Sequence, residues 1–297
     1  MKIAILLQCH KIPEQVNMFL ETMYDSVFTF FIHIDKKSSI GESLLKRNDI
    51  IILPDYLRVD VQWGNISQVD ATLNLMNYTK GYGEFDYYWL CSGQDFPIKP
   101  IKEIVSWFEE YSGYDFVELF QSKNYGLNYS CNYDKRNEII YPKWMLGNKK
   151  WKRVIKRLYV ELTGGYKKTF KCFKRKNILH MDFYFGSSWI CFSKCTFEWI
   201  MDYLKNHKEY YDFFTKCNCP DESFFQTLLM NSPYKTNRKD YLHYVDWSEG
   251  KNNPKVLTEK DYDSLKISKY LMARKFDILQ ERKVIDMILN DIEEKYK

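Results

Sequence analysis

Short apolar runs rich in β-branched and aromatic residues open the chain and predict buried strands. They cover residues 3–8 (IAILLQ) and 27–34 (VFTFFIHI), and apolar residues at helical spacing occupy residues 13–24 between them. This alternation is typical of a parallel sheet whose strands are joined by helices. The polar residues 35–38 follow the second run, at the strand end where open α/β sheets bind nucleotides. The pattern therefore predicts an α/β fold.

The rest of the chain continues the alternation of strands and helices. No internal repeat, low-complexity tract or linker interrupts it, so we expect one domain over residues 1–297. The further predicted strands are 50–53, 86–93, 115–119, 183–193 with a glycine kink, and 242–250. The further predicted helices are 67–78, 101–111, 194–206 and 258–277, the last with Thr258 as its N-cap.

Two adjacent carboxylates, Asp221 and Glu222, follow Pro220 and precede an apolar helical pattern. Proline suits the first turn of a helix because its missing N–H has no partner there, and acids in that turn complement the helix dipole. The pattern predicts that all three residues lie in a first helical turn. Helix capping alone is sufficient to explain both acids, so a chemical role requires further evidence.

Composition narrows the class of protein. Aromatic residues make up 18% of the chain, which excludes disorder and supplies both core and ligand-facing rings. The eight cysteines form no CxxC pair, no run of eighteen apolar residues occurs, and the first residues do not resemble a signal peptide. We expect reduced thiols, no spanning helix and a cytoplasmic protein.

Positive charge is concentrated between residues 143 and 176, where thirteen Lys and Arg meet one acid, Glu161. The net charge of +5 therefore leaves 5 − 12 = −7 for the remainder of the chain. Within this basic segment, apolar residues from Trp151 to Leu162 share one helical face and basic residues occupy the other. Two interpretations remain open: a solvated helix packed on the domain, or a helix that binds a membrane or another polyanion.

The chain contains no convincing metal-binding, hydrolase or nucleotide-binding motif of the common types. The only Asp-x-Asp sequence, Asp261-Tyr262-Asp263, falls in the first turn of a predicted helix, where the dipole explains acids. The five histidines lie far apart without ligand spacing, and no GxSxG, P-loop or GxGxxG sequence is present.

Six segments occur together in the order and approximate spacing of one family. The chain resembles the core-2/I-branching β-1,6-N-acetylglucosaminyltransferase and peptide xylosyltransferase family, glycosyltransferase family 14, over roughly residues 3–280. The resemblance implies a single GT-A type domain with a Rossmann-like mixed sheet, a nucleotide-diphosphate sugar donor, inversion at the anomeric carbon and no metal. The segments are LLQCHKIPEQVNMFLETMY, FFIHIDKKS, WLCSGQDFPIKPIKEIV, FGSSWICFSKCTFEWI, PDESFFQTLLMNSP and YLMARKFD.

The resemblance assigns the catalytic base to the glutamate of its P-D/A-E motif, which is Glu222 here. An inverting transfer needs one carboxylate to take the proton of the attacking hydroxyl, which agrees with this assignment. Without a metal, cations must stabilise the leaving diphosphate. The resemblance implies Lys275 for this task, with Arg274 as a weaker candidate. Lys255 is the nearest match for a second cation, and Lys251 is the alternative.

Further contacts are implied on both substrates. Asp35 resembles the family's acid near the nucleoside, although a strand-end turn also explains it. Trp247 matches a tryptophan that stacks on the acceptor, although burial in the core is also open. The remaining implied contacts are Ser92, Gly93 and Asp95 under the donor, and Glu118 and Arg136 at the acceptor.

Together these features predict an inverting, metal-independent transferase that uses a UDP-sugar, with GlcNAc, xylose or another hexose as the transferred unit. We expect a glycan or lipid-linked glycan acceptor in bacterial surface polysaccharide synthesis, no nucleic-acid partner, and a location in the cytoplasm or peripherally at the inner membrane face. Two alternatives stay open. The first is a non-catalytic protein that binds a nucleotide-sugar or a glycan. The second is a protein that binds a polyanion or a membrane surface through residues 143–176.

Overall fold

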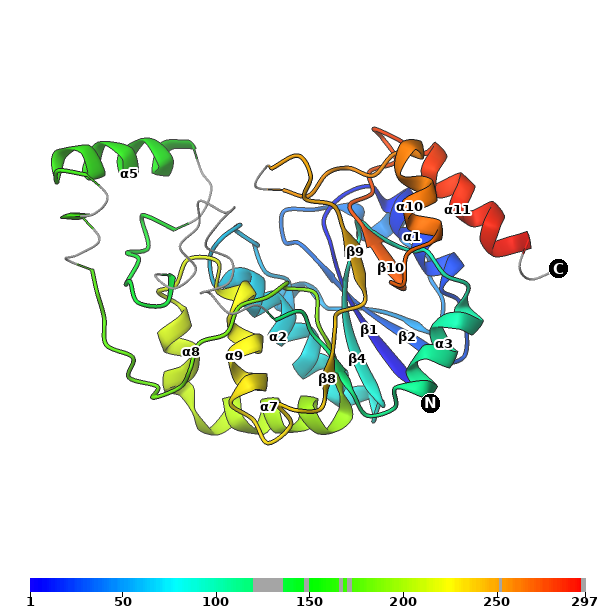
Figure 1. The fold of residues 1–297 in the computed structure, drawn as a ribbon, viewed down its shortest axis with the longest axis horizontal. Helices are drawn as coiled ribbons and strands as arrows, with labels where there is room; N and C mark the ends of the chain where they lie inside the picture. The colour runs from blue at the N-terminus through cyan, green and yellow to red at the C-terminus, as the bar shows by residue number, and fades with distance from the viewer. Residues whose placement is uncertain (120–135, 147–149, 166–167, 170–172, 251–252, 295–297) are drawn as a thin grey trace.

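A seven-stranded mixed sheet forms the centre of the computed structural model, which describes residues 1–119, 136–146, 150–165, 168–169, 173–250 and 253–294 (Figure 1). Its strand order is β3-β2-β1-β4-β7-β6-β8. β7 runs antiparallel to both of its neighbours, and the other adjacent pairs are parallel. The strands are β1 (Ile3–Cys9), β2 (Phe28–Ile34), β3 (Ile50–Ile52), β4 (Tyr87–Ser92), β6 (Asp115–Phe116), β7 (Cys191–Ser193) and β8 (Arg238–Lys239).

A second, three-stranded sheet lies beside the first and has the order β5-β10-β9. β10 pairs antiparallel with β5 and parallel with β9. This sheet joins the loop after β4 to the last third of the chain. Its strands are β5 (Asp95–Pro97), β9 (His243–Val245) and β10 (Met272–Arg274).

Helices cover both faces of the large sheet (Figure 1). The alternating side chains of β1 explain this, because Ile3, Ile5 and Leu7 enter one apolar core while Ala4 and Leu6 enter the other. The first core also receives α1, α3 and α11, and the second receives α2, α7, α8 and α9. The helices are α1 (Pro13–Thr22), α2 (Ser67–Thr79), α3 (Ile101–Glu110), α5 (Lys150–Leu162), α7 (Lys194–Asn206), α8 (Lys208–Phe214), α9 (Phe224–Met230), α10 (Tyr262–Lys266) and α11 (Lys283–Glu294).

Short 3₁₀ turns complete the described secondary structure. They are η1 (Ile40–Ser43), η2 (Asp55–Leu57), η3 (Lys80–Tyr82), η4 (Pro220–Glu222) and η5 (Glu259–Asp261). Thr258 does cap the last of these, since its N–H and hydroxyl both contact the Asp261 carboxylate, at 2.9 Å and 3.1 Å. This capping explains one acid of the Asp-x-Asp sequence without a metal.

The α/β prediction is confirmed, and four of the predicted elements need correction, among them the strand expected over 242–250, which is formed only at His243–Val245. The helix expected over 258–277 ends at Lys266, and Met272–Arg274 is a strand that pairs with two segments distant in sequence. The strand expected over 183–193 is formed only at Cys191–Ser193. The strand expected over 115–119 ends at Phe116.

Candidate active site

Glu222 lies at the end of η4, a turn that is separate from the helix after it. Ser223, at φ −141°, departs from helical geometry, and α9 begins at the next residue. The three residues Pro220–Glu222 do form one helical turn, as predicted, but the prediction that this turn begins the following helix is wrong. The turn begins at Cys219, whose φ of 49° is in the left-handed region, and the Cys219 N–H donates to the carbonyl of Gly64 at 3.0 Å.

The carboxylate of Glu222 forms an ion pair with the guanidinium of Arg136, through Oε2 and Nη1. The side chains are 31% and 11% exposed, so the acid remains reachable while the arginine is mostly enclosed. The structure thus brings together the predicted base and a predicted acceptor contact, which lie 86 residues apart in the chain.

Asp221 points to a different partner from Glu222. Its Oδ2 accepts a hydrogen bond from the Ser188 hydroxyl at 2.7 Å. Burial, and then the neighbouring charge of Glu222, raise the pKa of Asp221 to about 6. The two adjacent acids therefore have different surroundings: Asp221 ties the turn to the segment before β7, and Glu222 pairs with Arg136.

Glu118 lies in the same electrostatic neighbourhood as Glu222. Burial raises the pKa of Glu118 to about 7, opposed by a hydrogen bond from the Ser187 N–H and assisted by the charges of Asp240 and Glu222. The backbone is tightly packed here, because a Cβ on Gly186 would lie 1.8 Å from the carbonyl oxygen of Glu118. Glu118 can therefore hold a proton near neutral pH.

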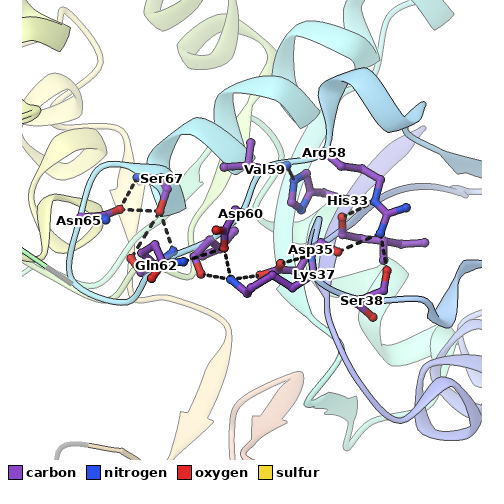
Figure 2. Close-up of polar contacts among 12 residues, drawn as sticks. His33, Asp35, Lys37, Ser38, Arg58, Val59, Asp60, Gln62, Asn65 and Ser67 are labelled. Atoms are coloured by element: carbon purple, nitrogen blue, oxygen red, sulfur yellow. Dashed lines mark hydrogen bonds and ion pairs between the residues drawn. The ribbon is translucent and has the colours of Figure 1, made fainter. Parts of the chain in front are cut away.

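Asp35 follows β2 and lies in a network of charged and polar side chains (Figure 2). Its Oδ1 accepts from the Lys37 N–H at 2.9 Å, and its Oδ2 lies 3.3 Å from the Lys37 ammonium. Arg58 braces the backbone beneath it by donating to the carbonyl oxygens of Ile34 and Asp35, both at 3.0 Å. The strand-end turn and an oriented carboxylate are thus both present at Asp35.

The same network fixes the segment after η2 against β2. The Val59 N–H donates to Nε2 of His33 at 2.9 Å, and burial lowers the pKa of His33 to about 4, so the ring stays neutral (Figure 2). Lys37 also pairs with Asp60 and donates to the carbonyl of Val61 at 2.6 Å. Since Gly64 contacts Cys219, this segment connects the end of β2 to the turn that carries Glu222.

Hydrogen bonds and close packing on β1 hold the backbone of the predicted donor loop after β4. The Ser92 N–H donates to Oδ2 of Asp95 at 2.7 Å, and the Ser92 Oγ accepts from the Gln94 N–H at 3.1 Å. Gly93 packs on β1 so closely that a Cβ would lie 2.8 Å from the Cβ of Cys9. Asp95 is fully buried, so its side chain supports the loop from beneath.

Arg274 lies beneath the same loop and is buried. Its guanidinium stacks 3.9 Å from the centre of the Trp189 ring, and its Nε lies 3.5 Å from Oδ1 of Asp95. Asp95, Cys91 and His243 are the group in the described residues whose atoms approach within the range of a metal site, at 4.8 Å or less. With the guanidinium beside that carboxylate, the group fits a buried polar cluster better than a divalent cation.

Lys275 follows β10 and is half-buried. Burial lowers its pKa first, followed by the positive charges of Arg274 and Lys11. The pKa of His10 is also lowered, by loss of solvent and then by Lys11, with further effects from Asp35 and Lys275. The segments of Asp35 and Lys275 both meet the carboxyl end of β1, since the Asp35 N–H donates to the carbonyl of Cys9 at 2.9 Å and Lys11 pairs with Asp277 at 2.6 Å.

The other predicted cation is engaged elsewhere. The Lys255 ammonium lies 2.6 Å from Oδ1 of Asp261 and 3.7 Å from Oδ2 of Asp246. Lys251 lies outside the described residues. Trp247, after β9, is 43% exposed, which excludes burial in the core and leaves its ring available for stacking.

Sequence reasoning missed several residues that shape the site. Ser188 holds Asp221, while the Asn137 side chain donates to the Ser223 hydroxyl at 2.8 Å. Lys11 pairs with Asp277 at 2.6 Å beside Lys275. The position of Lys11 just after the central strand was a usable signal, since ligands of α/β sheets bind at these strand ends. No local pattern marks Ser188 or Asn137.

The fold and the site share two features that characterise this protein. An oriented acid and cations lie at the strand ends of a mixed α/β sheet, and a carboxylate–arginine pair lies apart from them. The chain belongs to the Core-2/I-Branching enzyme family, whose sequence profile matches residues 7–270. The GT-A type fold expected from the resemblance agrees with this membership and with the observed sheet.

Two similar curated proteins are much longer than this chain. Rat Xylosyltransferase 2 is 24% identical over 319 residues, covering 97% of this chain and 33% of the relative. Human Xylosyltransferase 1 is 22% identical over 321 residues, covering 97% and 30%. The chain thus spans about a third of the length of the curated relatives that it matches.

Two solved structures show a looser likeness. Mouse Xyloside xylosyltransferase 1 in its apo form superposes with a TM-score of 0.40 and 9% identity, over 92% of this chain and 96% of that one. An active-site mutant of LgtC superposes with a TM-score of 0.40 and 10% identity, over 93% and 87%.

Proposed function

We propose that this chain transfers a sugar from a UDP-sugar to a hydroxyl of a glycan, with inversion at the anomeric carbon. The observation that carries this proposal is the ion pair between Glu222, in the family's P-D/A-E motif, and Arg136. Arg136 fixes the direction of the carboxylate through Oε2, and we assign Oε1 to the acceptor hydroxyl. The base is then oriented before substrate binds, as general base catalysis requires.

The proposed reaction is a single displacement. The acceptor oxygen forms a bond to the anomeric carbon while the bond from that carbon to the β-phosphate oxygen breaks. The hydroxyl proton passes to Glu222, and UDP leaves with the electron pair of the broken bond. Glu118, whose pKa is about 7, is then available to hydrogen bond another acceptor hydroxyl either as donor or as acceptor.

The donor is assigned to the carboxyl ends of β1, β2 and β4. We propose that Asp35 accepts hydrogen bonds from the nucleoside, and that Ser92 and Gly93 lie under the donor sugar and diphosphate with Asp95 and Arg274 supporting them. Lys275 is the principal cation for the leaving diphosphate. Lys255 has a smaller share, because it must first leave Asp261 and Asp246.

No metal takes part in the proposed mechanism. Support comes from the donor set, because Asp261 of the lone Asp-x-Asp sequence is engaged by Thr258 and Lys255. The test is transfer in excess EDTA, with and without added manganese. We expect equal rates, and activity that is lost in EDTA and restored by manganese would refute the metal-free mechanism.

The catalytic base is tested by Glu222→Gln. We expect turnover to fall on the order of a hundredfold or more, with little change in the KM for the donor, because the amide cannot accept the proton. Asp221→Asn is the matched control and should lose far less turnover, since the Asp221 side chain accepts a hydrogen bond from Ser188. The exposed Glu42→Gln is the surface control. A fully active Glu222→Gln protein would remove the assignment.

The transferred sugar and the acceptor are proposals at a coarser level. The relatives are named for xylosyl transfer and the family for branching of glycans, so UDP-xylose and UDP-GlcNAc are the first donors to test. We keep glycans and lipid-linked glycans of bacterial surface polysaccharides as the acceptor class, with a cytoplasmic site of action. Donor hydrolysis and transfer measured across a panel of UDP- and GDP-sugars distinguish the donors.

A further inference from the structure

The amphipathic helix α5 is turned with its apolar face outward. Val160 is the buried residue of this helix and lies roughly opposite Trp151 around the helix axis. An ordinary surface helix does the reverse and covers its apolar stripe. Five apolar side chains of α5 are between 45% and 86% exposed: Trp151, Val154, Ile155, Leu158 and Leu162.

Polar contacts hold the opposite side of α5 against the protein. The Lys152 ammonium donates to the carbonyl oxygens of Lys143 and Leu146, at 3.1 Å and 2.9 Å. The Lys156 ammonium lies 5.9 Å from the centre of the Tyr141 ring, and burial lowers the pKa of Lys156. The outward direction of the apolar stripe is therefore fixed by specific contacts on the inner side.

Figure 1 places α5 at the margin of the molecule, apart from the helices that cover the sheet. The exposed basic side chains of Lys150 and Arg157 border one side of the apolar stripe, and the exposed Arg153 lies further around the helix, next to Val160. Arg157 pairs with Glu161, the one acid of the helix, at 3.0 Å. The sequence of α5 carries five Lys and Arg against that single acid.

We infer that α5 docks this protein on an anionic lipid bilayer, with the apolar stripe entering the interface and the flanking cations contacting lipid phosphates. Both features are needed for that geometry, in which the helix lies in the plane of the surface. A second copy of the chain fits less well, since two helices of equal positive charge would face each other. A nucleic acid would leave the apolar stripe unused.

Docking of this kind is peripheral. No helix in the described ranges is both long and apolar enough to cross a bilayer. The inference does not depend on the proposed transfer reaction, because α5 contains none of the residues assigned to chemistry. Vesicle binding and catalysis can therefore fail independently.

The test is flotation of the full chain with phosphatidylcholine vesicles, with and without phosphatidylglycerol, at low and high salt. We expect binding only with phosphatidylglycerol, weakened by salt. Leu158→Glu should reduce binding on the order of tenfold or more by placing a carboxylate in the stripe. Ile267→Glu is the matched control, because Ile267 is 85% exposed and lies after α10.

A second pair of variants tests the charges. The double variant Lys150→Gln with Arg153→Gln should reduce binding on the order of tenfold. The double variant Lys46→Gln with Lys205→Gln removes the same charge from exposed positions outside α5 and should bind as the wild type. Circular dichroism and transfer to a soluble acceptor check that each variant is folded.

Four results would overturn the inference. They are no flotation at low salt, equal binding to neutral vesicles, unchanged binding of Leu158→Glu, and dimers in sedimentation that Leu158→Glu dissociates. The last result would assign the stripe to a second copy of the chain. RNA is the remaining alternative. If the protein does not float with vesicles but binds RNA in a salt-sensitive way, and this binding is lost in the Lys150→Gln, Arg153→Gln variant and kept in Leu158→Glu, then α5 is a polyanion-binding helix.

Discussion

Glu118 and Glu222 lie near each other but are stabilised by different means. Glu222 is paired with an arginine, whereas burial raises the pKa of Glu118 to about 7. Glu118 can thereby hold a proton near neutral pH. This suits an acceptor-binding role for Glu118, because a protonated carboxyl can donate a hydrogen bond as well as accept one.

The raised pKa of Glu118 makes stability depend on pH. Its folded pKa exceeds the unfolded value of 4.5, so its stabilising contribution is complete below about pH 4.5 and is lost as pH rises through 7. Glu118→Gln removes this titration. Relative to wild type, we expect the variant to gain about 1–3 kcal/mol in unfolding free energy between pH 5 and pH 8.

Denaturant unfolding of both proteins at the two pH values measures this difference. Glu42→Gln is the control, because its side chain is exposed and should leave the pH dependence of wild type unchanged. If wild type and Glu118→Gln show the same pH dependence, Glu118 does not hold a proton near neutral pH.

At the scale of elements, Gly186 is the point where the chain before β7 meets both site acids. Its N–H donates to the carbonyl of Glu222 at 2.9 Å, and a Cβ would overlap the carbonyl of Glu118. Since the obstacle is backbone, it cannot move aside as a flexible side chain would. Glycine is needed here for space.

Gly186→Ala should therefore destabilise the fold by about 2–4 kcal/mol and reduce transfer by displacing the turn of Glu222. Gly81→Ala is the matched control, since nothing lies within 4 Å of a Cβ there. Thermal unfolding and steady-state kinetics of both variants measure the two effects. Equal stability of Gly186→Ala and Gly81→Ala would show that the backbone at Glu118 is free to shift.

Several long elements and β3 could be predicted from the sequence, whereas α11 (Lys283–Glu294) was not among the expected helices and β10 was expected as part of a helix. The runs of β1, β2 and β4 and the helical spacing of α2 and α7 are local signals, and the structure has these elements close to the expected bounds. β10 has only three residues and forms because β5 and β9 lie on either side of it. Such pairing is set by the fold, so a helical pattern over 258–277 was misleading.

The same distinction applies to the site. The motif around Glu222 marked it as the proposed base, but its partner Arg136 is 86 residues away and only the fold brings the two together. The partners of Lys255 lie within nine residues of it, yet no sequence pattern showed that they would occupy its ammonium. For α5, periodicity gave the apolar face but not the direction in which that face points.

At the scale of the whole molecule, charge and chemistry are separated. The segment 143–176 carries an excess of +12, while the rest of the chain, with every residue assigned to catalysis, sums to −7. α5 lies apart from the sheet (Figure 1). A surface attracted to anionic lipid is therefore distinct from the site proposed to bind an anionic donor, and each can be altered without the other.

The proposed donor site joins segments from both ends of the chain, so its ligand should stabilise the whole fold. Asp35 follows β2, and Lys275 follows β10. At a UDP concentration a hundred times its Kd, the unfolding free energy of wild type should rise by about 2.7 kcal/mol. Lys275→Gln loses an ammonium–phosphate interaction, which we expect to weaken UDP binding about tenfold. Its gain at the same concentration then falls to about 1.4 kcal/mol.

Chemical unfolding with UDP and with uridine separates the diphosphate from the nucleoside. Uridine should stabilise wild type and Lys275→Gln equally, because it has no phosphate to contact the ammonium. Lys255→Gln should keep most of the UDP effect, since Asp261 and Asp246 already hold that ammonium, and Leu158→Glu on α5 should keep all of it. The assignment of the diphosphate contact to Lys275 would be wrong if UDP stabilised Lys275→Gln as much as wild type. It would also be wrong if Lys255→Gln lost more of the UDP stabilisation than Lys275→Gln, and Lys255 would then be the diphosphate contact.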